Sequence, residues 1–492
     1  MQHLDQSDVP GILFEAMQIA GPAENAAGVL QVISPCDQRV IAEVETADGT
    51  HVDQALRTAH RLFRDRDAWI PLQQRIAILE RAAELMSSDH AGLARLAASE
   101  GGKPLHDSRV EVARAIDGVK LCIETLRSDC GSVIPMGTTP ASSAHLAFTQ
   151  KEPIGVVVAV SAFNHPLNLI VHQVAAAVAA GCPVIVKPAD DTPLSCFRFA
   201  RILSAAGLPQ GWCQVLVAKD TATAEQLVTD KRVAFFSFIG SARVGWMLRS
   251  KLAPGTRCAL EHGGAAPVIL ADDFDPEVAC AAILKGGFYH AGQVCVSVQR
   301  VFAPRRAARK FALELARRAT RLRVGDPADE DTEVGPLIRP AEVTRVHEWV
   351  DAAVAGGAEL LSGGEPQGGN FYPCTVLFDP PADAKVSTDE IFGPVVCVYP
   401  YDHLDQAIAA ANSLPVAFQA AVFTRDIDRV LNIYRRLDAS AVMVNEHTAF
   451  RVDGMPFAGL RESGLGVGGI SHSIADMQIE KMLVLRSAEP GA

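Results

Sequence analysis

Three side chains at separate points of the sequence have the chemistry needed for nucleophilic catalysis by a thiol. Cys295 lies in the run HAGQVCVSVQR, and a thiol in a glycine-containing turn is a plausible nucleophile where a base or dipole favours its thiolate. Glu261 ends the apolar run of ALEHGG, before paired glycines that let a ligand approach the backbone closely. Asn164 follows the apolar run IGVVVAV. Taken singly, each has an ordinary explanation: an inert core thiol, a surface carboxylate and a helix cap.

Two other runs have residue types suited to a nucleotide. VIVKPADD places Lys187 and Asp190 after an apolar run, where a cation and a carboxylate can hold a ribose. IGSARVG places Gly240, Ser241 and Gly245 at a predicted helix start, where exposed N–H groups can bind a pyrophosphate. The spacing differs from the GxGxxG fingerprint, and no Walker lysine follows. Each run alone is therefore a weak indicator of nucleotide binding.

Short apolar runs alternate with amphipathic stretches around these residues. Strands are predicted at IGVVVAV, PVIVK, CQVLVA and VAFFSFI, with helices over 166–180, 192–206 and 221–228. This alternation favours a parallel sheet with right-handed crossovers. Asn164 and Lys187 then lie at the carboxyl ends of strands, where open α/β sheets bind ligands. Residues 50–127 are predicted to form helices that cover this sheet.

The 492 residues exceed the roughly 250–300 that one hydrophobic core serves, so two large domains are expected. After Pro267 a second alternation includes PVILAD, VQRVFA, AAVFT and AVMVNE, which predicts a second α/β domain. Residues 128–148, rich in Ser, Thr and Gly, interrupt the first domain, and MLVLR near the C-terminus predicts a lone strand. These two segments predict an arm that pairs with a neighbouring subunit. The expected division is 1–127 and 149–260, 261–468, and 128–148 with 469–492.

Composition excludes several classes of protein. Apolar residues make up 49% and charged residues 21%, as in a globular protein, and the net charge of −12 argues against nucleic acid or an anionic membrane as partner. The N-terminus lacks the features of a secretory signal. We therefore expect a cytoplasmic protein. Polar residues interrupt the apolar stretch 167–186, which predicts a buried helix and strand rather than a membrane span. Eleven scattered cysteines without a CxxC pair predict neither disulfides nor zinc, and no metal is expected.

The joint occurrence of these runs, in this order, closely resembles the aldehyde dehydrogenase superfamily. Further matching motifs are SPCDQRVIAEV near residue 34, EIFGPV at 390–395 and PFAGLRESGLG at 456–466, so the resemblance covers nearly the whole chain. The separation between Glu261 and Cys295, 295 − 261 = 34 residues, is also the family's. The resemblance implies an α/β fold with a Rossmann-like cofactor domain, a second α/β catalytic domain and a small β oligomerisation arm. It also implies a homodimer or homotetramer.

The resemblance assigns a role to each motif. Cys295 matches the nucleophile, Glu261 the general base and Asn164 the residue that binds the oxyanion. The implied cofactor residues are Lys187, Asp190, Gly240, Ser241, Gly245, Glu390 and Phe392. Together they imply that an aldehyde is oxidised with NAD(P)+ to a carboxylic acid, through a cysteine thioester that a Glu-activated water hydrolyses.

The sequence departs from the common family pattern at several positions: Val294 replaces a frequent Cys, Asp190 a Glu, His262 a Leu, Ala265 a Lys and Ala458 a Gly. Asp190 is one methylene shorter than Glu and leaves room for a 2′-phosphate. Its carboxylate nevertheless repels phosphate, so we expect NAD, with NADP possible.

His165 and Arg451 resemble the branch of the family that handles short, oxygenated or anionic aldehydes, of the lactaldehyde, phosphonoacetaldehyde and glyceraldehyde-3-phosphate types. Arg451 either clamps an anionic group of the substrate or holds its own loop through Asp453 or backbone carbonyls. Arg109 and Arg114, five residues apart, either reach the substrate entrance or lie on a solvated helix face. The apolar Val294 fits an uncharged aldehyde equally well.

Two other functions compete. A CoA-acylating semialdehyde dehydrogenase uses the same thiol, but it does not need the water-activating Glu261. A non-redox protein on this scaffold, such as a thioesterase or a lens-type structural protein, is the second. The complete set of Asn164, Glu261, Cys295 and Glu390 counts against that loss of catalysis.

Overall fold

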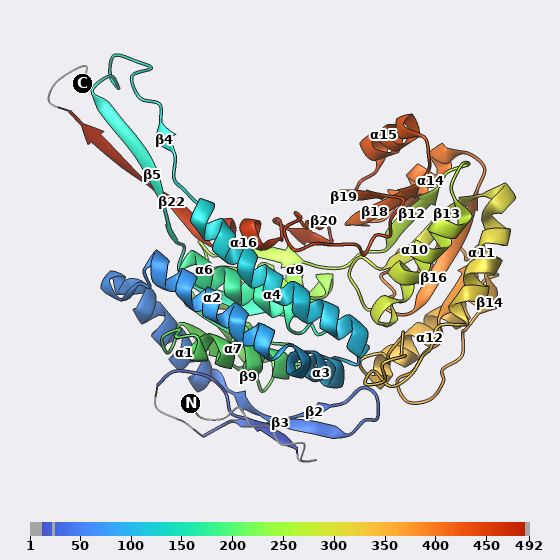
Figure 1. The fold of residues 1–492 in the computed structure, drawn as a ribbon, viewed down its shortest axis with the longest axis horizontal. Helices are drawn as coiled ribbons and strands as arrows, with labels where there is room; N and C mark the ends of the chain where they lie inside the picture. The colour runs from blue at the N-terminus through green and yellow to red at the C-terminus, as the bar shows by residue number, and fades with distance from the viewer. Residues whose placement is uncertain (1–11, 22–24, 488–492) are drawn as a thin grey trace.

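Two α/β lobes and a projecting β arm make up the computed structural model, which describes residues 12–21 and 25–487 (Figure 1). The first lobe contains a six-stranded sheet in the order β21-β11-β10-β6-β7-β8. Its strands are β6 (Val156–Val160), β7 (Val184–Lys187), β8 (Cys213–Val215), β10 (Val233–Ile239), β11 (Arg257–Glu261) and β21 (Gly464–Leu465). All pairs are parallel except β11 with β21, so the predicted parallel sheet is confirmed.

Helices cover both faces of this sheet. Successive residues of a strand point to opposite faces, and here the residues on both faces are apolar and need to be covered. Val157 and Ala159 of β6 belong to one hydrophobic cluster, while Val156 and Val158 belong to another. The helices of this lobe are α1 (Gly49–Arg64), α2 (Leu72–Ser88), α3 (His90–Gly101), α4 (Leu105–Ser128), α7 (Leu194–Ala205), α8 (Thr221–Thr229), α9 (Ala242–Arg249) and α16 (Ile470–Asp476), with a 3-10 turn at Arg66–Ala68. The predicted helical region 50–127 is thus confirmed.

The predicted buried helix after β6 is present with a local irregularity. It consists of α5 (Asn168–Ile170), a π-helical turn (Val171–Ala175) and α6 (Ala176–Ala180), and β7 follows. A π-helical turn widens the backbone by one residue and is frequent at functional sites. None of the helices in the described ranges is long and apolar enough to cross a membrane.

A second sheet of seven strands, in the order β14-β15-β16-β13-β12-β18-β19, forms the other lobe. Its strands are β12 (Ala266–Leu270), β13 (Val298–Pro304), β14 (Glu359–Ser362), β15 (Thr375–Phe378), β16 (Val395–Tyr401), β18 (Gln419–Phe423) and β19 (Ala441–Val444). Its helices are α10 (Pro276–Phe288), α11 (Arg305–Ala319), α12 (Pro340–Ala355), α13 (Lys385–Thr388), α14 (Leu404–Ala411) and α15 (Ile427–Arg436). The second α/β unit predicted after Pro267 is therefore present.

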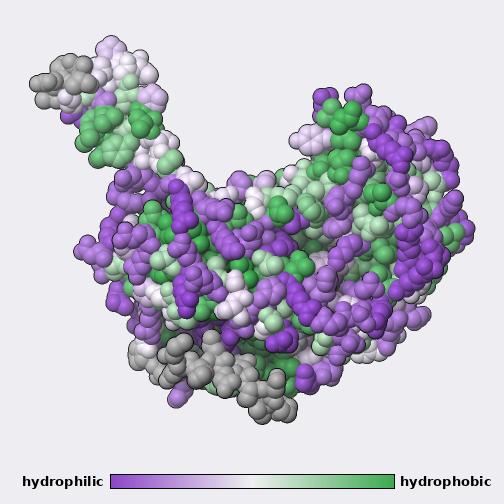
Figure 2. Space-filling model, in the orientation of Figure 1, coloured by the Kyte–Doolittle hydropathy of each residue, from purple (hydrophilic) through white to green (hydrophobic). Residues whose placement is uncertain are grey.

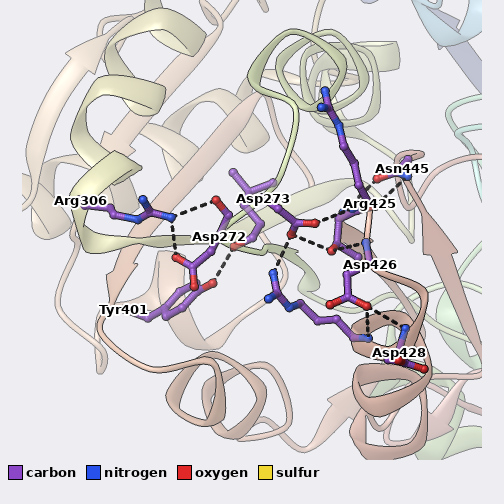
Figure 3. Close-up of polar contacts among 11 residues, drawn as sticks. Asp272, Asp273, Arg306, Tyr401, Arg425, Asp426, Asp428 and Asn445 are labelled. Carbon is purple, nitrogen blue, oxygen red and sulfur yellow. Dashed lines mark hydrogen bonds and ion pairs between the residues drawn. The ribbon is translucent and has the colours of Figure 1, made fainter.

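Charged side chains tie together the loops at the carboxyl ends of β12 and β18 (Figure 3). The carboxylate of Asp273 accepts hydrogen bonds from Thr424 Oγ1 at 2.7 Å, from the Arg425 N–H at 2.9 Å and from Arg429 Nη1 at 2.6 Å. Asp426 caps α15 by accepting a hydrogen bond from Asp428 N at 2.9 Å. Because these carboxylates are paired within the protein, we interpret the cluster as structural.

The arm consists of β4 (Val133–Ile134), β5 (His145–Pro153) and β22 (Gln478–Arg486) and projects from the first lobe (Figure 1). The prediction of a lone C-terminal strand is wrong. β22 is longer than MLVLR and pairs antiparallel with β5 of the same chain, from Gln478 opposite Pro153 to Arg486 opposite His145. The reason is that residues 145–153 also form a long strand, which gives β22 a partner within the chain.

Smaller strands complete the fold. β1 (Leu13–Glu15), β2 (Gly28–Ile33), β3 (Val40–Ala47) and β9 (Val217–Ala218) form a sheet beside α1, and β17 (Val416–Ala417) pairs with β20 (Leu460–Arg461). The motif SPCDQRVIAEV thus leads into strand β3.

Candidate active site

A cavity of about 860 Å³ lies at the carboxyl ends of the first sheet and extends to the second lobe. It brings together all but one of the residues predicted from the sequence: Asn164, His165, Lys187, Asp190, Gly240, Ser241, Glu261, Cys295, Glu390, Phe392 and Arg451. Gly245 is the exception. It packs against His262, and a Cβ added at Gly245 would lie 2.0 Å from the His262 Cε1 atom.

The loop that carries Cys295 has an unusual backbone. After α10, His290, Ala291 and Gly292 have φ angles of 49°, 54° and 70°. Positive φ is uncommon for residues other than glycine, and such strain often occurs at functional sites. Position 292 also has no space for a side chain, since a Cβ added to Gly292 would lie 2.1 Å from the carbonyl oxygen of Gly393. The nucleophile loop and the EIFGP loop are therefore in direct backbone contact.

Asn164 is connected directly to the nucleophile loop. Its Nδ2 donates a hydrogen bond to the Gln293 carbonyl at 2.8 Å. The Gln293 side chain fixes the loop further, because its Oε1 accepts from Ile338 N at 3.0 Å and its Nε2 donates to Pro336 O at 3.3 Å. An amide nitrogen has two protons, so Asn164 keeps one for a ligand in the cavity.

The electrostatic surroundings of Cys295 favour the neutral thiol. Burial raises the pKa of Cys295 to about 12; Glu390 and Glu261 act in the same direction, and Arg451 opposes them. The thiolate is the reactive form, so the thiol must transfer its proton to a base before it attacks. Glu261 lines the same cavity.

Glu261 ends β11, where Gly464 of β21 pairs with it. Burial raises the pKa of its carboxyl group, and the Arg451 cation opposes this shift. A raised carboxyl pKa suits a general base that works near neutral pH. The carboxylate lies against Gly468, since a Cβ added there would be 2.1 Å from Glu261 Oε1.

The cavity lining has the groups expected of a dinucleotide site. Lys187 Nζ lies 2.6 Å from Asp190 Oδ1, and Asp190 is exposed beside the mainly buried lysine. Gly240 and Ser241 precede α9, whose first N–H groups can bind a pyrophosphate. The buried Oε1 of Glu390 has no hydrogen-bond partner in the described residues. Burial raises the pKa of Glu390 to about 8.

Phe392 follows Glu390 in a strained conformation with a φ of 47°, and its ring meets Phe163 edge to face at 5.7 Å. An unpaired carboxyl oxygen for a hydroxyl group, a helix start for phosphates and a lysine–aspartate pair for a ribose together fit a nicotinamide dinucleotide.

Arg451 lies on the substrate side with unused hydrogen-bond donors. Its guanidinium carbon is 3.7 Å from the centre of the Phe457 ring, and its buried Nε and Nη2 have no partner in the described residues. Asp453 does not hold this arginine. Its carboxylate instead accepts hydrogen bonds from Arg114 at 2.8 and 3.0 Å and from His172 Nε2 at 2.8 Å.

His165 is buried beside the cavity, and its pKa lies well below the usual histidine value. Burial is the main cause, and the cations of Lys103 and Arg114 add to it. The imidazole is therefore neutral near pH 7. It can hydrogen-bond a substrate hydroxyl but cannot pair with an anion.

The sequence alone did not show which of the two arginines, Arg114 or Arg109, faces the cavity. Arg114 lines the cavity, whereas Arg109 pairs with the exposed Glu330 at 2.5 Å. Five residues correspond to roughly 140° around a helix, so the two side chains point in different directions. α12 also contributes cavity residues that no motif indicated: Glu342, Arg345 and Trp349.

Known proteins match this chain over almost its full length. The model of the aldehyde dehydrogenase family matches residues 23–483. The 3-sulfolactaldehyde dehydrogenase of Priestia aryabhattai is 36% identical over 469 residues, which are 95% of this chain and 97% of that protein.

Solved structures agree with this match. Aldehyde dehydrogenase 21 from Physcomitrella patens, in complex with the reaction product succinate, has a TM-score of 0.92 and 32% identity and covers 97% of this chain and 99% of its own. The glyceraldehyde-3-phosphate dehydrogenase of Methanocaldococcus jannaschii, complexed with NADP, has a TM-score of 0.89 and 32% identity, with 93% and 99% covered. The chain belongs to the aldehyde dehydrogenase family and is an oxidoreductase that acts on aldehydes with NAD(P).

Proposed function

We propose that this protein oxidises a short aldehyde with an anionic group to the corresponding acid, through a thioester on Cys295. The observation that carries the substrate class is Arg451, whose buried Nε and Nη2 have no partner in the described residues. Burying unpaired donors costs free energy, and an anionic substrate group would satisfy them. Phe457 supports the guanidinium plane from one side.

In the first step, the Cys295 sulfur loses its proton to a base and bonds to the aldehyde carbon. The oxygen becomes an oxyanion, which accepts hydrogen bonds from the Asn164 amide and the Cys295 backbone N–H. Such donors stabilise the transition state because they are already oriented when charge develops. When bound, a nicotinamide dinucleotide supplies the hydride acceptor that converts this adduct to the thioester.

In the second step, Glu261 takes a proton from a water molecule, whose oxygen attacks the thioester carbon. The carbon–sulfur bond then breaks, the acid is released and the sulfur regains a proton. Such a general-base step contributes typically about 10²–10⁴ in rate. The presence of Glu261 in the cavity favours hydrolysis over transfer to CoA.

Three of the similar proteins fit an anionic substrate, whereas the lactaldehyde dehydrogenase of Methanocaldococcus jannaschii, 33% identical, is named for a neutral one. The protein from Priestia aryabhattai is named for 3-sulfolactaldehyde, the solved structure from Methanocaldococcus jannaschii for glyceraldehyde 3-phosphate, and the Physcomitrella patens enzyme was solved with succinate. His165 adds a neutral hydrogen-bonding group beside the cavity, which suits a hydroxyl group on the same aldehyde.

We propose NAD as the preferred cofactor, since the exposed Asp190 carboxylate repels a 2′-phosphate, although Lys187 partly neutralises it.

The expected division into a cofactor domain (1–127 and 149–260), a catalytic domain (261–468) and an arm (128–148 and 469–492) stays part of this proposal. Two separate, mainly parallel sheets with their own hydrophobic clusters support the two α/β domains. At the arm, β5 extends to Pro153, and α16 packs Ile470 and Ile474 into the core of the first lobe.

We further propose that the arm joins two copies of the chain in a homodimer or homotetramer. β22 is an edge strand of the arm sheet in the described residues, and an edge strand is a template for pairing with another chain. Its exposed side chains include Met482, Leu483, Val484 and Leu485, and apolar residues gather on the arm (Figure 2).

All eleven cysteines are free, which fits a reducing, cytoplasmic compartment.

The decisive experiment uses purified protein, a panel of anionic and neutral aldehydes, NAD or NADP, and CoA present or absent. Absorbance of the reduced nicotinamide measures turnover. We expect reduction with anionic aldehydes without CoA and none with Cys295→Ala. Strict dependence on CoA would assign the protein to the acylating class, and activity of Cys295→Ala would refute the nucleophile.

A further inference from the structure

A second, smaller cavity lies behind Glu261. Glu261 lines both this cavity and the large one, whereas Cys295 lines only the large one. The space open to the centre of a water molecule is about 10 Å³, about the minimum that holds one water. Besides Glu261, its polar lining consists of His172, Gln173, Ser237, Ser473 and Asp476, of which His172 is already paired with Asp453. The size and the lining both fit a single buried water.

Gln173 provides an independent sign of a missing partner. Its Nε2 donates to Val160 O and Ser237 O at 3.2 Å each and to Ser237 Oγ at 3.0 Å. Because both carbonyl groups only accept, the amide nitrogen must face them. Its Oε1 is thereby left buried without a partner in the described residues, on a side chain only 2% exposed. A water that donates to this oxygen would satisfy it.

The absence of a side chain at Gly468 places Glu261 beside this water site. The Glu261 Oε1 atom lies 2.1 Å from where a Cβ at position 468 would be, so any larger residue would displace the carboxylate. The carboxylate therefore occupies the boundary between the two cavities.

Asp476, the last residue of α16, connects the small cavity with solvent. It lines the small cavity and also an open surface groove of about 730 Å³, in which Arg249 and Arg257 lie. Burial raises the pKa of Asp476, while His472 and Arg257 oppose this shift. An ionisable group that faces both an internal water site and the surface can pass protons between them.

We propose that one water, bound by Gln173 and Ser237, links Glu261 to Asp476, and that the proton which Glu261 takes during thioester hydrolysis leaves by this rear path. The Glu261 carboxyl group gives its proton to the water, and the water gives one of its own to the Asp476 carboxylate, which releases it to solvent. This transfer moves only protons: no bond to carbon is formed or broken, and no group is oxidised or reduced. During hydrolysis the large cavity holds the acyl group, so a separate exit keeps the proton away from the reacting atoms.

This proposal rests on the proposed general-base role of Glu261, and 4-nitrophenyl acetate tests both without a cofactor. The ester acylates a thiol directly and releases 4-nitrophenolate as a burst, after which the steady rate reports thioester hydrolysis. We expect Asp476→Asn and Gln173→Leu to keep the burst amplitude, which shows an intact fold and nucleophile. Their steady rates should fall about 10- to 100-fold, as expected for an impaired proton transfer.

Three further measurements distinguish proton transfer from a structural effect. Added imidazole buffer should restore the rate of Asp476→Asn, Asp476→Glu should retain most activity, and the D₂O effect on the steady rate should rise in Asp476→Asn. The matched control is Asp117→Asn, an exposed acid on α4, which should match the wild type.

The outcomes separate the two proposals. If Glu261→Gln hydrolyses its thioester normally, the general-base role itself is wrong. If Glu261→Gln is impaired while Asp476→Asn and Gln173→Leu deacylate at the wild-type rate at every pH and buffer concentration, only the rear path is refuted. A high-resolution crystal structure should show water density beside Gln173 Oε1, and a dry cavity would also overturn the proposal.

Discussion

Arg451 and Phe457 form a stacked pair in the cavity wall, with the guanidinium carbon 3.7 Å from the ring centre. The stack holds the cation in place while its Nε and Nη2 have no partner in the described residues. A planar, oriented guanidinium matches a carboxylate, sulfonate or phosphate.

We therefore predict that Arg451→Ala raises KM at least about tenfold for an anionic aldehyde, equivalent to 1.4 kcal/mol, and leaves a neutral aldehyde nearly unchanged. Initial-rate kinetics with both substrates measure this. The matched control is Arg109→Ala, because Arg109 pairs with the exposed Glu330 and does not line the cavity. Equal effects of Arg451→Ala on both substrates would refute the clamp.

Asn164 is predicted to contribute mainly to the transition state. Asn164→Ala removes the Nδ2 donor, and losing one oxyanion donor typically lowers kcat by about 10²–10³. The same substitution removes the hydrogen bond to the Gln293 carbonyl, so the melting temperature should be recorded alongside kcat. A variant with normal stability and nearly normal kcat would show that the oxyanion is bound elsewhere.

The reactivity of Cys295 should depend strongly on pH in the absence of ligands. Its pKa is raised to about 12, so the thiolate is a minor species at neutral pH and its fraction grows about tenfold per pH unit up to the pKa. Alkylation by iodoacetamide, followed for this residue by mass spectrometry, should rise correspondingly between pH 7 and 10. A plateau below pH 9 would mean that a base already activates the thiol in the free protein.

Asp190 is predicted to control the choice of cofactor. Asp190→Ser removes a carboxylate that pairs with Lys187 at 2.6 Å, which frees the lysine to attract a 2′-phosphate. We expect the ratio of kcat/KM for NADP to that for NAD to increase about tenfold, or 1.4 kcal/mol. The ratio should be measured with one aldehyde at saturation. An unchanged ratio would place cofactor selection at other residues.

Most strands of the first sheet and four of the seven strands of the second were predictable because their periodicity is strong and local, whereas β14, β15 and β16 were not predicted. The position of Asn164 and Lys187 in the cavity could be predicted because ligands bind at the carboxyl ends of parallel strands, and both residues lie at such ends. Cys295 and Glu261 required the resemblance to a family, because neither a lone cysteine nor a glutamate at a strand end is informative by itself.

Other features depend on contacts between distant segments. Arg114 and Asp453 are 339 residues apart, and no local pattern shows that they form an ion pair. The same holds for Gly468, whose role is visible only once Glu261 lies against it. The pairing of β22 with β5 was missed for the same reason, since strand partners far apart in sequence are not encoded in either strand alone.

The π-helical turn Val171–Ala175 makes two consecutive residues serve different partners. His172 is hydrogen-bonded to Asp453, while Gln173 is hydrogen-bonded to Ser237, and both His172 and Gln173 line the small cavity behind Glu261. A π-helical turn holds one residue more than a regular helical turn, so deleting one residue here would convert it to a regular helix and remove His172 or Gln173 from its partner. In this stretch a change of length is therefore more damaging than a change of residue type, and single-residue deletions here should be far less tolerated than point substitutions.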